Sequence, residues 1–340
     1  MTRKFLLGFT LLAVILGFVY LRTRRPKAPI EVAYAGNREV VVYSTTALVR
    51  SPVATLAFGD RVDILQRFQD QVNVRTKGGV TGWVSERELL SADLWQKARD
   101  LELKSAQVPV QARGHTKVLS NLRLDPGRDT QRLQQLVKGV SVDVLSRQAV
   151  PVPAPRSGGG QAQEESAAEP AQAKKEDWLL VRAHTGPNAS LSGWLLGRFI
   201  DLDVPRPLPD YASSANMRIV GWYELNHVND VGGKAKPQYL VVGTHGPEGQ
   251  PCDFTMLRVF TWGSKRERYE TAFVESDVCG KLPVNVTPGT GGRNAVDAQF
   301  SFVDLGDASS EPRTYVMHQT VVRRLRAPAS PAKPKSSARR

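Results

Sequence analysis

The sequence is poor in the side chains that enzymes use for nucleophilic or metal chemistry. Its 340 residues include only two cysteines and five histidines. The histidines are scattered, with no His-X-X-X-His pair or other metal-ligand spacing. Neither cysteine lies in a segment that resembles a nucleophile-bearing helix, and the glycine cluster Gly289 to Gly292 lacks the lysine and following helix of a phosphate-binding loop. We therefore predict no catalytic, metal-binding or cofactor-binding residues, and we do not expect an enzyme.

Acidic residues are absent from both ends of the chain. Residues 1–27 contain six Lys or Arg side chains and residues 323–340 contain seven, with no Asp or Glu in either segment. These thirteen side chains account for the whole formal charge of +13, so residues 28–322 are neutral. A nucleic-acid-binding domain normally carries a basic face on its folded body. The charge distribution therefore argues against a nucleic-acid partner.

Charge of either sign is absent from residues 5–21. As a helix this segment would span about 25 Å, and flanking Lys and Arg side chains that snorkel could extend it to the ~30 Å of a hydrocarbon core. We predict an uncleaved single-pass membrane anchor within residues 1–27; a cleaved signal peptide and a buried helix are the alternatives. The flanking charges weakly favour a cytoplasmic body, whereas the two cysteines and the β-rich pattern are typical of exported proteins. We expect export.

One stretch of the sequence occurs twice, imperfectly. Residues 58–65 read FGDRVDIL and residues 138–145 read KGVSVDVL. Each copy later reaches a Gly-Trp pair followed by an apolar residue, in Gly82-Trp83-Val84 and in Gly193-Trp194-Leu195. Short β-branched runs separated by turn residues such as Gly78-Gly79 predict antiparallel strands. Two copies of one small all-β unit indicate a binding or scaffolding protein more readily than an enzyme.

The two copies resemble the bacterial SH3 (SH3b) domain family. That family's pattern has a glycine before a V-x-V-L strand and a closing G-W-V. The residues quoted above follow it in order, with Ile64 for the second valine of the strand in the first copy and Leu195 for the last valine in the second. The resemblance covers about residues 42–91 and 115–202, under half of the chain. It implies two small SH3-like barrels that act as exported binding modules, with peptidoglycan or envelope proteins as partners.

The closing tryptophans, Trp83 and Trp194, have two interpretations. A small barrel has few other large residues with which to fill its interior, and this favours a place in the core. The alternative is that either ring lines a ligand groove, which makes both residues candidate binding residues.

Composition divides the rest of the chain. Residues 28–40 are expected to be a short polar connector, and apolar residues recur with helical spacing after Ser91, a suitable N-cap. Residues 150–175 have almost no large apolar side chain, which predicts a disordered insertion in the second barrel. Strand-like runs without helical periodicity follow the proline-rich segment 203–209. The expected domains are an anchor at 1–27, a first barrel at 40–91, a linker helix at 92–107, a second barrel at 113–204, an antiparallel β domain at 211–325 and a disordered basic tail at 326–340.

Cys252 and Cys279 both lie in loop-like contexts. In an exported protein they would form a disulfide worth roughly 2–4 kcal/mol; two free thiols are the alternative. The same region is rich in aromatic residues that alternate with polar ones, which predicts core packing, with an aromatic binding face as the alternative: Trp222, Tyr223, Tyr239, Phe260, Trp262 and Tyr269.

The expected fold class is all-β, with two barrels, a C-terminal antiparallel β domain, an N-terminal transmembrane helix and a short linker helix. The expected function is that of a non-enzymatic scaffold or targeting protein of the bacterial inner membrane, with a periplasmic body whose barrels bind a cell-wall or protein ligand. Two alternatives stay open: a cell-wall hydrolase or hydrolase regulator with activity in residues 211–325, and a cytoplasm-facing membrane scaffold.

Overall fold

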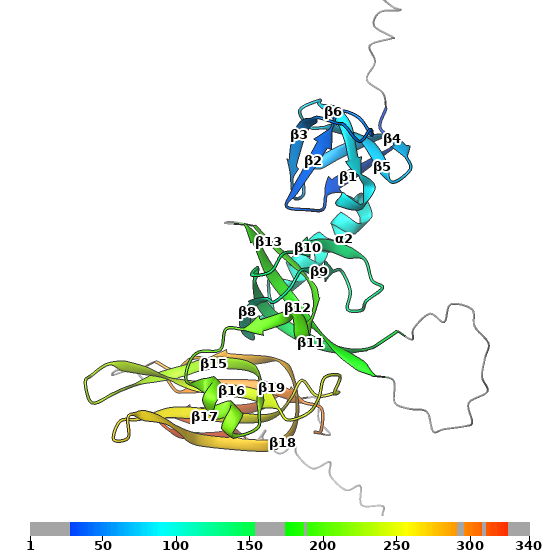
Figure 1. Cartoon of the computed structure of the whole chain (residues 1–340). Helices are drawn as coiled ribbons and strands as arrows, with labels where there is room; N and C mark the ends of the chain where they lie inside the picture. Colours follow the sequence, from blue (N-terminus) through cyan, green and yellow to red (C-terminus); the bar gives the residue numbers. More distant parts are fainter. Residues whose placement is uncertain (1–27, 154–173, 187–188, 291–295, 308–310, 326–340) are drawn as a thin grey trace, which may run out of the picture. The chain divides into compact units, whose positions relative to one another are not determined.

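The computed structural model describes residues 28–153, 174–186, 189–290, 296–307 and 311–325. This part of the chain is mostly β structure, with three antiparallel sheets of seven strands each and two α-helices, which confirms the predicted all-β class (Figure 1). The predicted anchor at 5–21, the predicted tail at 326–340 and residues 154–173 of the predicted insertion lie outside the described residues. Among the residues that are described, no helix combines the length and the apolar character needed to cross a membrane.

The chain forms two compact units, and the boundary between them falls within helix α2 (Ala92–Ser105), between Gln96 and Lys97. The N-terminal unit contains the first sheet, and the C-terminal unit contains the second and third sheets. Each unit has a hydrophobic core of its own.

The first sheet has the strand order β3-β2-β6-β5-β4-β1-β7. Alternate residues of its strands point into one core, as Val62 and Ile64 do in β4 and Val72 and Val74 do in β5. A short 3₁₀ turn, Glu86–Glu88, precedes the last strand. The strands are β1 (Glu31–Ala35), β2 (Glu39–Tyr43), β3 (Pro52–Ala57), β4 (Arg61–Phe68), β5 (Gln71–Thr76), β6 (Thr81–Ser85) and β7 (Leu89–Ser91).

Two glycines of the repeated motif have different structural roles. Gly59, in the turn before β4, has a φ of +83°, a conformation that side-chain-bearing residues rarely adopt. Gly82, in β6, faces the interior, and a Cβ atom there would lie 2.6 Å from the carbonyl oxygen of Tyr43. The Gly-Trp pair therefore begins with glycine because β2 passes too close to β6 for a side chain.

The polar connector predicted at residues 28–40 is wrong, because β1 lies within this segment and β2 begins at Glu39. The strand pairs with β4 and β7 and brings Ala33 and Ala35 into the core. Its inward residues are alanines, which carry little of the β-branched and aromatic signal that marks a strand in a sequence.

Helix α2 begins at the predicted cap, because the Leu94 N–H donates to Ser91 Oγ at 3.2 Å. Within the N-terminal unit, the Trp95 ring stacks on Tyr34 with 4.9 Å between ring centroids. Within the C-terminal unit, a carboxylate oxygen of Glu102 accepts from the Ser192 N–H at 2.5 Å. Each end of the helix thus packs against the sheet of its own unit.

The second sheet repeats the topology of the first. Its order, β10-β9-β13-β12-β11-β8-β14, is that of the first sheet with every strand number raised by seven. The turn glycine recurs as Gly139, with a φ of +86°, and so does the register shift in the central hairpin, at Ile64/Gln66 and at Val144/Ser146. The strands are β8 (Ala112–Thr116), β9 (Ser120–Arg123), β10 (Arg132–Leu136), β11 (Ser141–Pro151), β12 (Lys175–Gly186), β13 (Ala189–Leu196) and β14 (Ile200–Leu202), with a 3₁₀ turn at Gly197–Phe199.

The central hairpin is longer in the second sheet than in the first. β4 and β5 pair as far as Phe68 and Gln71, whereas β11 and β12 pair as far as Pro151 and Lys175. The ladder therefore includes both margins of the insertion predicted at 150–175.

The third sheet is an antiparallel meander, with its strands in sequence order from β15 to β21. Strand β18 is unusually long: its first half pairs with β17 and its second half with β19. A short helix, α3 (Leu208–Ser214), precedes the sheet and begins within the proline-rich boundary segment. The strands are β15 (Arg218–Asn229), β16 (Ala235–Thr244), β17 (Phe254–Gly263), β18 (Arg268–Thr287), β19 (Ala298–Asp304), β20 (Arg313–His318) and β21 (Val321–Leu325).

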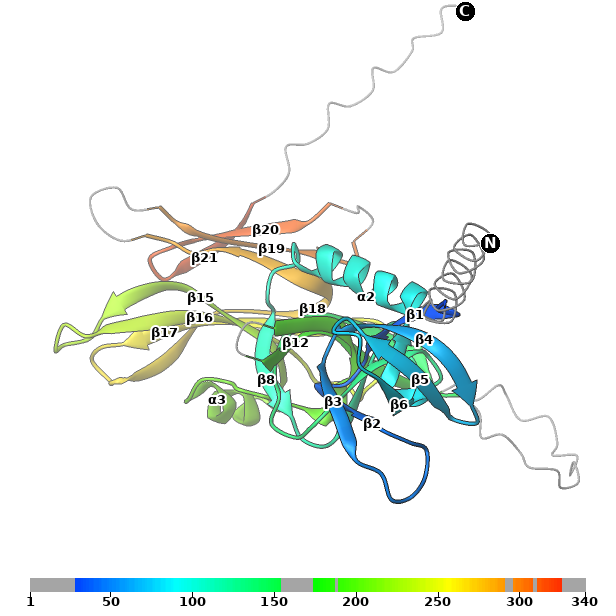
Figure 2. The ribbon, with the colours of Figure 1, turned by 90° about the horizontal axis from the view of Figure 1, so that it is seen from above.

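The meander has a hydrophobic cluster on each face of its first half. Figure 2 shows strands β19–β21 on one side of β15–β17 and α3 on the other. Tyr223 lies in the first cluster with residues of β19 and β20, whereas Tyr239, Phe260 and Tyr269 lie in the second, against α3. The aromatic residues of this region thus pack mainly as core, with Trp222 and Trp262 partly buried at the margin of the second cluster.

Candidate functional site

The core interpretation of Trp83 and Trp194 is wrong. Both rings are only partly buried, whereas the neighbours of each ring along its strand are buried. Because side chains alternate along a strand, the two rings lie on the outer faces of their sheets. The interior of the first sheet is filled by small and aliphatic side chains instead: Ala33, Ala35, Val40, Val42, Leu56, Val62, Ile64, Val72, Val74 and Val84.

In the N-terminal unit, Trp83 belongs to an aromatic strip that consists of the partly buried Tyr43 and Trp83 and the exposed Phe68. Tyr43 is the cross-strand partner of Trp83, and the Phe68 ring meets Trp83 edge-on with 6.4 Å between centroids. The Arg50 guanidinium lies over the Tyr43 ring at 3.9 Å from its centroid. Phe68 is 50% exposed, and Leu48, in the loop after β2, is fully exposed. An exposed apolar surface of this kind is typical of a binding face.

The corresponding face of the second sheet has a different composition. By register, Arg123 takes the place of Tyr43 beside Trp194, and Gln148 takes the place of Phe68 at the hairpin. The Arg123 guanidinium donates a hydrogen bond to the Thr130 carbonyl oxygen, which fixes the position of the side chain. Burial lowers the pKa of the Arg123 guanidinium. The aromatic strip is thus a property of the first copy of the repeat.

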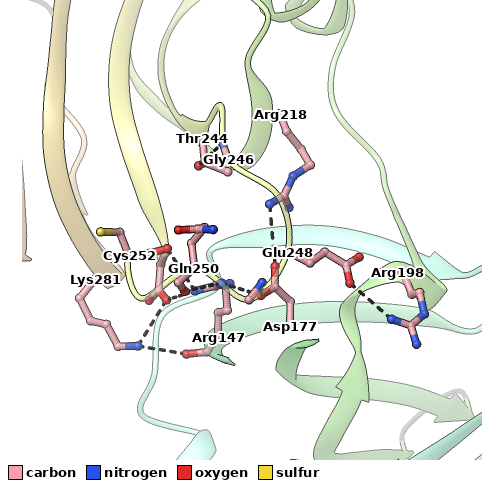
Figure 3. A network of polar contacts seen from close by, with 12 residues as sticks. Arg147, Asp177, Arg198, Arg218, Thr244, Gly246, Glu248, Gln250, Cys252 and Lys281 are labelled. Carbon is pink, nitrogen blue, oxygen red and sulfur yellow. Dashed lines mark hydrogen bonds and ion pairs between the residues drawn. The ribbon is translucent and has the colours of Figure 1, made fainter. Parts of the chain in front are cut away.

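The second sheet is joined to the third by a buried polar network around Arg147 of β11 (Figure 3). Arg147 donates to the Asp177 carboxylate at 2.5 Å and to the Asp253 carboxylate at 2.9 Å. It also donates to the carbonyl oxygens of Gln250 and Cys252, at 2.8 and 3.2 Å. All three charged side chains are 5% exposed or less. Burial alone would lower the pKa of the guanidinium, but the two carboxylates raise it above its ordinary value.

The first sheet has an arginine at the equivalent register position, Arg67, with very different surroundings. Arg67 forms ion pairs with Glu31 and Glu86, and its side chain is 40% exposed. An exposed pair of this kind contributes little to stability, whereas a buried one is costly to break. The same position of the repeat therefore serves a surface contact in one copy and a domain contact in the other.

The predicted disulfide between Cys252 and Cys279 is present, and it lies in the loop that supplies three of the four Arg147 acceptors, from Gln250, Cys252 and Asp253. Asp253 follows Cys252, and its backbone N–H donates to the Gly280 carbonyl at 2.9 Å. Its buried carboxylate also accepts from Lys281 Nζ at 3.3 Å and from the Leu282 N–H at 2.8 Å. The disulfide thus ties the network loop to β18.

A second contact between the two sheets is made by Gln111, which is 1% exposed. Its side-chain oxygen accepts from the Tyr223 hydroxyl and from the Val284 N–H, both at 2.7 Å. Burial raises the pKa of Tyr223 well above its usual range, so the phenol stays a hydrogen-bond donor.

Beside the Arg147 network lies a cleft of about 560 Å³ between the second sheet, α3 and the start of β15. Its apolar walls include Leu179, Ile200 and Ile219, and the charged side chains Lys117, Arg198, Arg218, Asp201 and Glu248 also line it. Arg198 is engaged, because it donates to the buried Glu176 carboxylate at 2.6 Å and contacts Glu248 at 3.4 Å. Ligand pockets occur preferentially at domain interfaces of this kind.

Glu176, the partner of the cleft residue Arg198, has a strongly lowered pKa. Hydrogen bonds from Arg128 and from Arg198 lower its pKa from the usual 4.5 to about 2, although burial acts in the opposite direction. Two Arg128 nitrogens reach the two oxygens of Glu176 at 2.8 and 2.5 Å, a bidentate geometry. Glu176 is therefore ionised at neutral pH and holds Arg198 in place.

Nucleophilic and metal chemistry would use cysteine, histidine and carboxylate side chains. Both cysteines of the sequence are in the disulfide, so neither is a thiol nucleophile in this state. No cluster of three or more His, Cys, Asp or Glu side chains suited to a metal ion occurs in the described ranges. His115, His184 and His318 each have an aspartate oxygen at 2.9–3.0 Å.

No protein-family model matches the chain, and no curated protein matches it. Among solved structures, it is similar to an NlpC/P60 family protein from Bacillus cereus ATCC 10987, with 12% identity, coverage of 55% of this chain and 62% of that chain, and a TM-score of 0.22. It is also similar to NlpC2 from Trichomonas vaginalis, with 10% identity, coverage of 74% and 97%, and a TM-score of 0.18. The chain thus spans less than two thirds of the first of these proteins, and both TM-scores are too low to show a shared fold.

Proposed function

We propose that this protein is a non-enzymatic, membrane-anchored protein of the bacterial cell envelope, with two SH3-like barrels that have different roles. The first barrel binds a cell-wall ligand, and the second carries the C-terminal β domain. The observation that carries the proposal is the contrast between two sheets of identical strand order. The first presents the aromatic strip, whereas the second has Arg123 and Gln148 at the matching positions and uses Arg147 for a domain contact.

Three features support the SH3-like assignment beyond the sequence resemblance. The first and second sheets each have seven antiparallel strands, a turn glycine with positive φ before the central hairpin, and a short 3₁₀ turn before the last strand. The location in the envelope rests on the apolar segment 5–21 of the sequence and on the disulfide, which is typical of oxidising compartments.

The aromatic strip suits a wall ligand made of sugars and short peptides. Aromatic rings offer large, rigid contact surfaces at a low cost in conformational entropy, and they pack against the apolar faces of sugars and side chains. Arg50, over Tyr43, adds a positive charge next to the strip, which suits the carboxylates of such a ligand.

Co-sedimentation of the full chain with purified peptidoglycan sacculi tests this proposal. We expect the chain to sediment with the sacculi and to release no soluble muropeptides. Phe68→Ser should weaken sedimentation at least several-fold, because the ring is exposed and contributes to the surface rather than to the core. Val118→Ser is the matched control, since Val118 is a similarly exposed apolar residue, at 45%, in the connection between β8 and β9 of the second sheet.

Two results would overturn the proposal. Release of muropeptides by the purified chain would identify a hydrolase, which is the main alternative. Equal sedimentation of Phe68→Ser and Val118→Ser would show that the aromatic strip does not bind the wall. Protease treatment of intact spheroplasts tests orientation separately: digestion of the folded body is expected, and its protection would identify the cytoplasm-facing scaffold.

A further inference from the structure

The cleft beside the Arg147 network is left unused by the proposed function, which places wall binding on the first barrel. Its volume of about 560 Å³ is within the range of small-molecule sites, and its walls combine apolar side chains with a few charged ones. The apolar part is continuous with the cluster beneath α3, through Ala212 and Met217. A ligand here would meet an apolar wall from both domains and charge at defined places.

The cations that line the cleft differ in how well they are paired. Arg147 and Arg198 have carboxylate partners at 2.5 and 2.6 Å. Arg218 has no hydrogen-bond acceptor in the described part of the chain: its nearest carboxylate oxygen belongs to Asp177, at 3.8 Å, and the other oxygen of Asp177 is already bonded to Arg147. Figure 3 shows Arg218 extending from β15 towards Asp177. Its side chain is 51% exposed, so an incoming ligand can reach it.

The carboxylates that line the cleft restrict the charge of a ligand. Asp177, Asp201 and Glu248 all contribute to the lining, and each would repel a doubly charged group such as a phosphate. A single carboxylate can instead pair with the planar guanidinium of Arg218 through two parallel hydrogen bonds. Asp201 is 60% exposed, and its ion-pair partners among the described residues are Lys117 and His115, at 3.7 and 4.0 Å. It can therefore accept hydrogen bonds from amide groups of the same ligand.

We propose that the cleft between the second sheet and the C-terminal β domain binds a monocarboxylate that carries an aliphatic group, with the carboxylate at Arg218 and the aliphatic group against the apolar wall. Two sources share this chemistry: the free C-terminal end of a short peptide and a short-chain fatty acid. This site is independent of the aromatic strip, so the failure of one proposal leaves the other standing.

Isothermal titration of the full chain in neutral detergent tests this site with three probes: N-acetyl-Ala-Leu, its C-terminal amide and hexanoate. We expect the free peptide to bind with a Kd of roughly 0.1–1 mM, as suits a ligand of its size. Loss of the charge-assisted pair should make the amide about 10- to 100-fold weaker. Tighter binding of the peptide than of hexanoate would identify a peptide end as the source, and the reverse order would identify a fatty acid.

Three variants make the test specific. Arg218→Gln should reduce binding about as much as the amide does. Arg268→Gln is the matched control, because Arg268 is an exposed arginine of the same domain, 59% exposed, outside the cleft, and binding should be unchanged. Ser213→Trp places a ring in the cleft from the exposed side of α3 and should abolish binding without a change in Tm. Equal binding of acid and amide, undiminished binding by Arg218→Gln or Ser213→Trp, or no binding of either acid would overturn the proposal.

Discussion

Replacement of Arg147 by methionine should separate the second sheet from the C-terminal β domain. The change keeps much of the length of the side chain but removes the guanidinium that bonds to the carboxylates of Asp177 and Asp253, which are 5% and 0% exposed. Two carbonyl oxygens, of Gln250 and Cys252, also lose their donor. Asp253 keeps Lys281 and the Leu282 N–H as partners, and Asp177 keeps the Gly249 N–H.

The expected cost is about 3–5 kcal/mol, the range found when one partner of a buried ion pair is removed. The remaining partners of Asp253 place the estimate towards the lower end. Since a typical domain has only ~5–15 kcal/mol of stability, such a loss should lower the melting temperature by several degrees or more. The measurement is urea denaturation at pH 7, followed by far-UV circular dichroism of the full chain and of the variant.

Arg67→Met is the matched control, because Arg67 occupies the equivalent register position of the first sheet. Its pairs with Glu31 and Glu86 are about 40% exposed, so the expected cost is below about 1 kcal/mol. Equal costs for the two substitutions would refute the claim that the second copy of the repeat has a buried domain contact at this position. An Arg147→Met variant more stable than the unchanged chain would show that the buried ion pairs of Arg147 contribute no net stability.

Three further predictions concern the disulfide, a buried carboxylate and the turn glycines. Joint replacement of Cys252 and Cys279 by serine removes a cross-link over a sequence separation of 27 and should cost about 2–4 kcal/mol in urea denaturation; an unchanged midpoint would refute this. Because the pKa of Glu176 is lowered to about 2 in the folded protein, its ion pairs stabilise the fold above pH 4.5, and about 1–3 kcal/mol should be lost as the pH falls from 4.5 to 2. Glu176→Gln should flatten this part of the stability profile, and a parallel profile would contradict the assignment. Gly59→Ala should destabilise the protein more than Gly139→Ala. Both glycines have positive φ, but a Cβ at position 59 would also lie 2.7 Å from the Trp95 ring, whereas a Cβ at position 139 meets no atom within 4 Å. Calorimetry of the two variants measures the difference, and equal losses of stability would show that the Trp95 ring moves aside at little cost.

Much of the fold follows from local sequence patterns. The alternation of β-branched residues, the turn glycines and the repeated motif depend on neighbours along one strand or hairpin, and these features predicted the antiparallel sheets and the meander. The cap at Ser91 is equally local. The disulfide could be predicted because the sequence has only two cysteines to pair. Strand β1 was missed because its buried residues are alanines.

The candidate sites depend on contacts between distant segments. Nothing near Arg147 in the sequence distinguishes it from Arg67, because the partners that decide its role lie 30 and 106 residues away. The position of Trp83, unlike the role of Arg147, can be read from the local sequence. The alternation of Gly82, Trp83 and Val84 places the Trp83 ring on the opposite face of the strand from the buried residues. Applying the two-residue period to the motif would have assigned both closing tryptophans to the outer face.

The central claim is that two barrels of one topology have different roles, the first in binding and the second in domain contact. Its most direct test is the indole N–H spectrum of the full chain, labelled with ¹⁵N at its six tryptophans and titrated with soluble muropeptides. Single Trp→Phe variants assign the signals. We expect the Trp83 signal to shift with added muropeptide while those of Trp178 and Trp194 stay unchanged. A shift of Trp194 with Trp83 unmoved would contradict the account, because it would place the ligand on the second barrel.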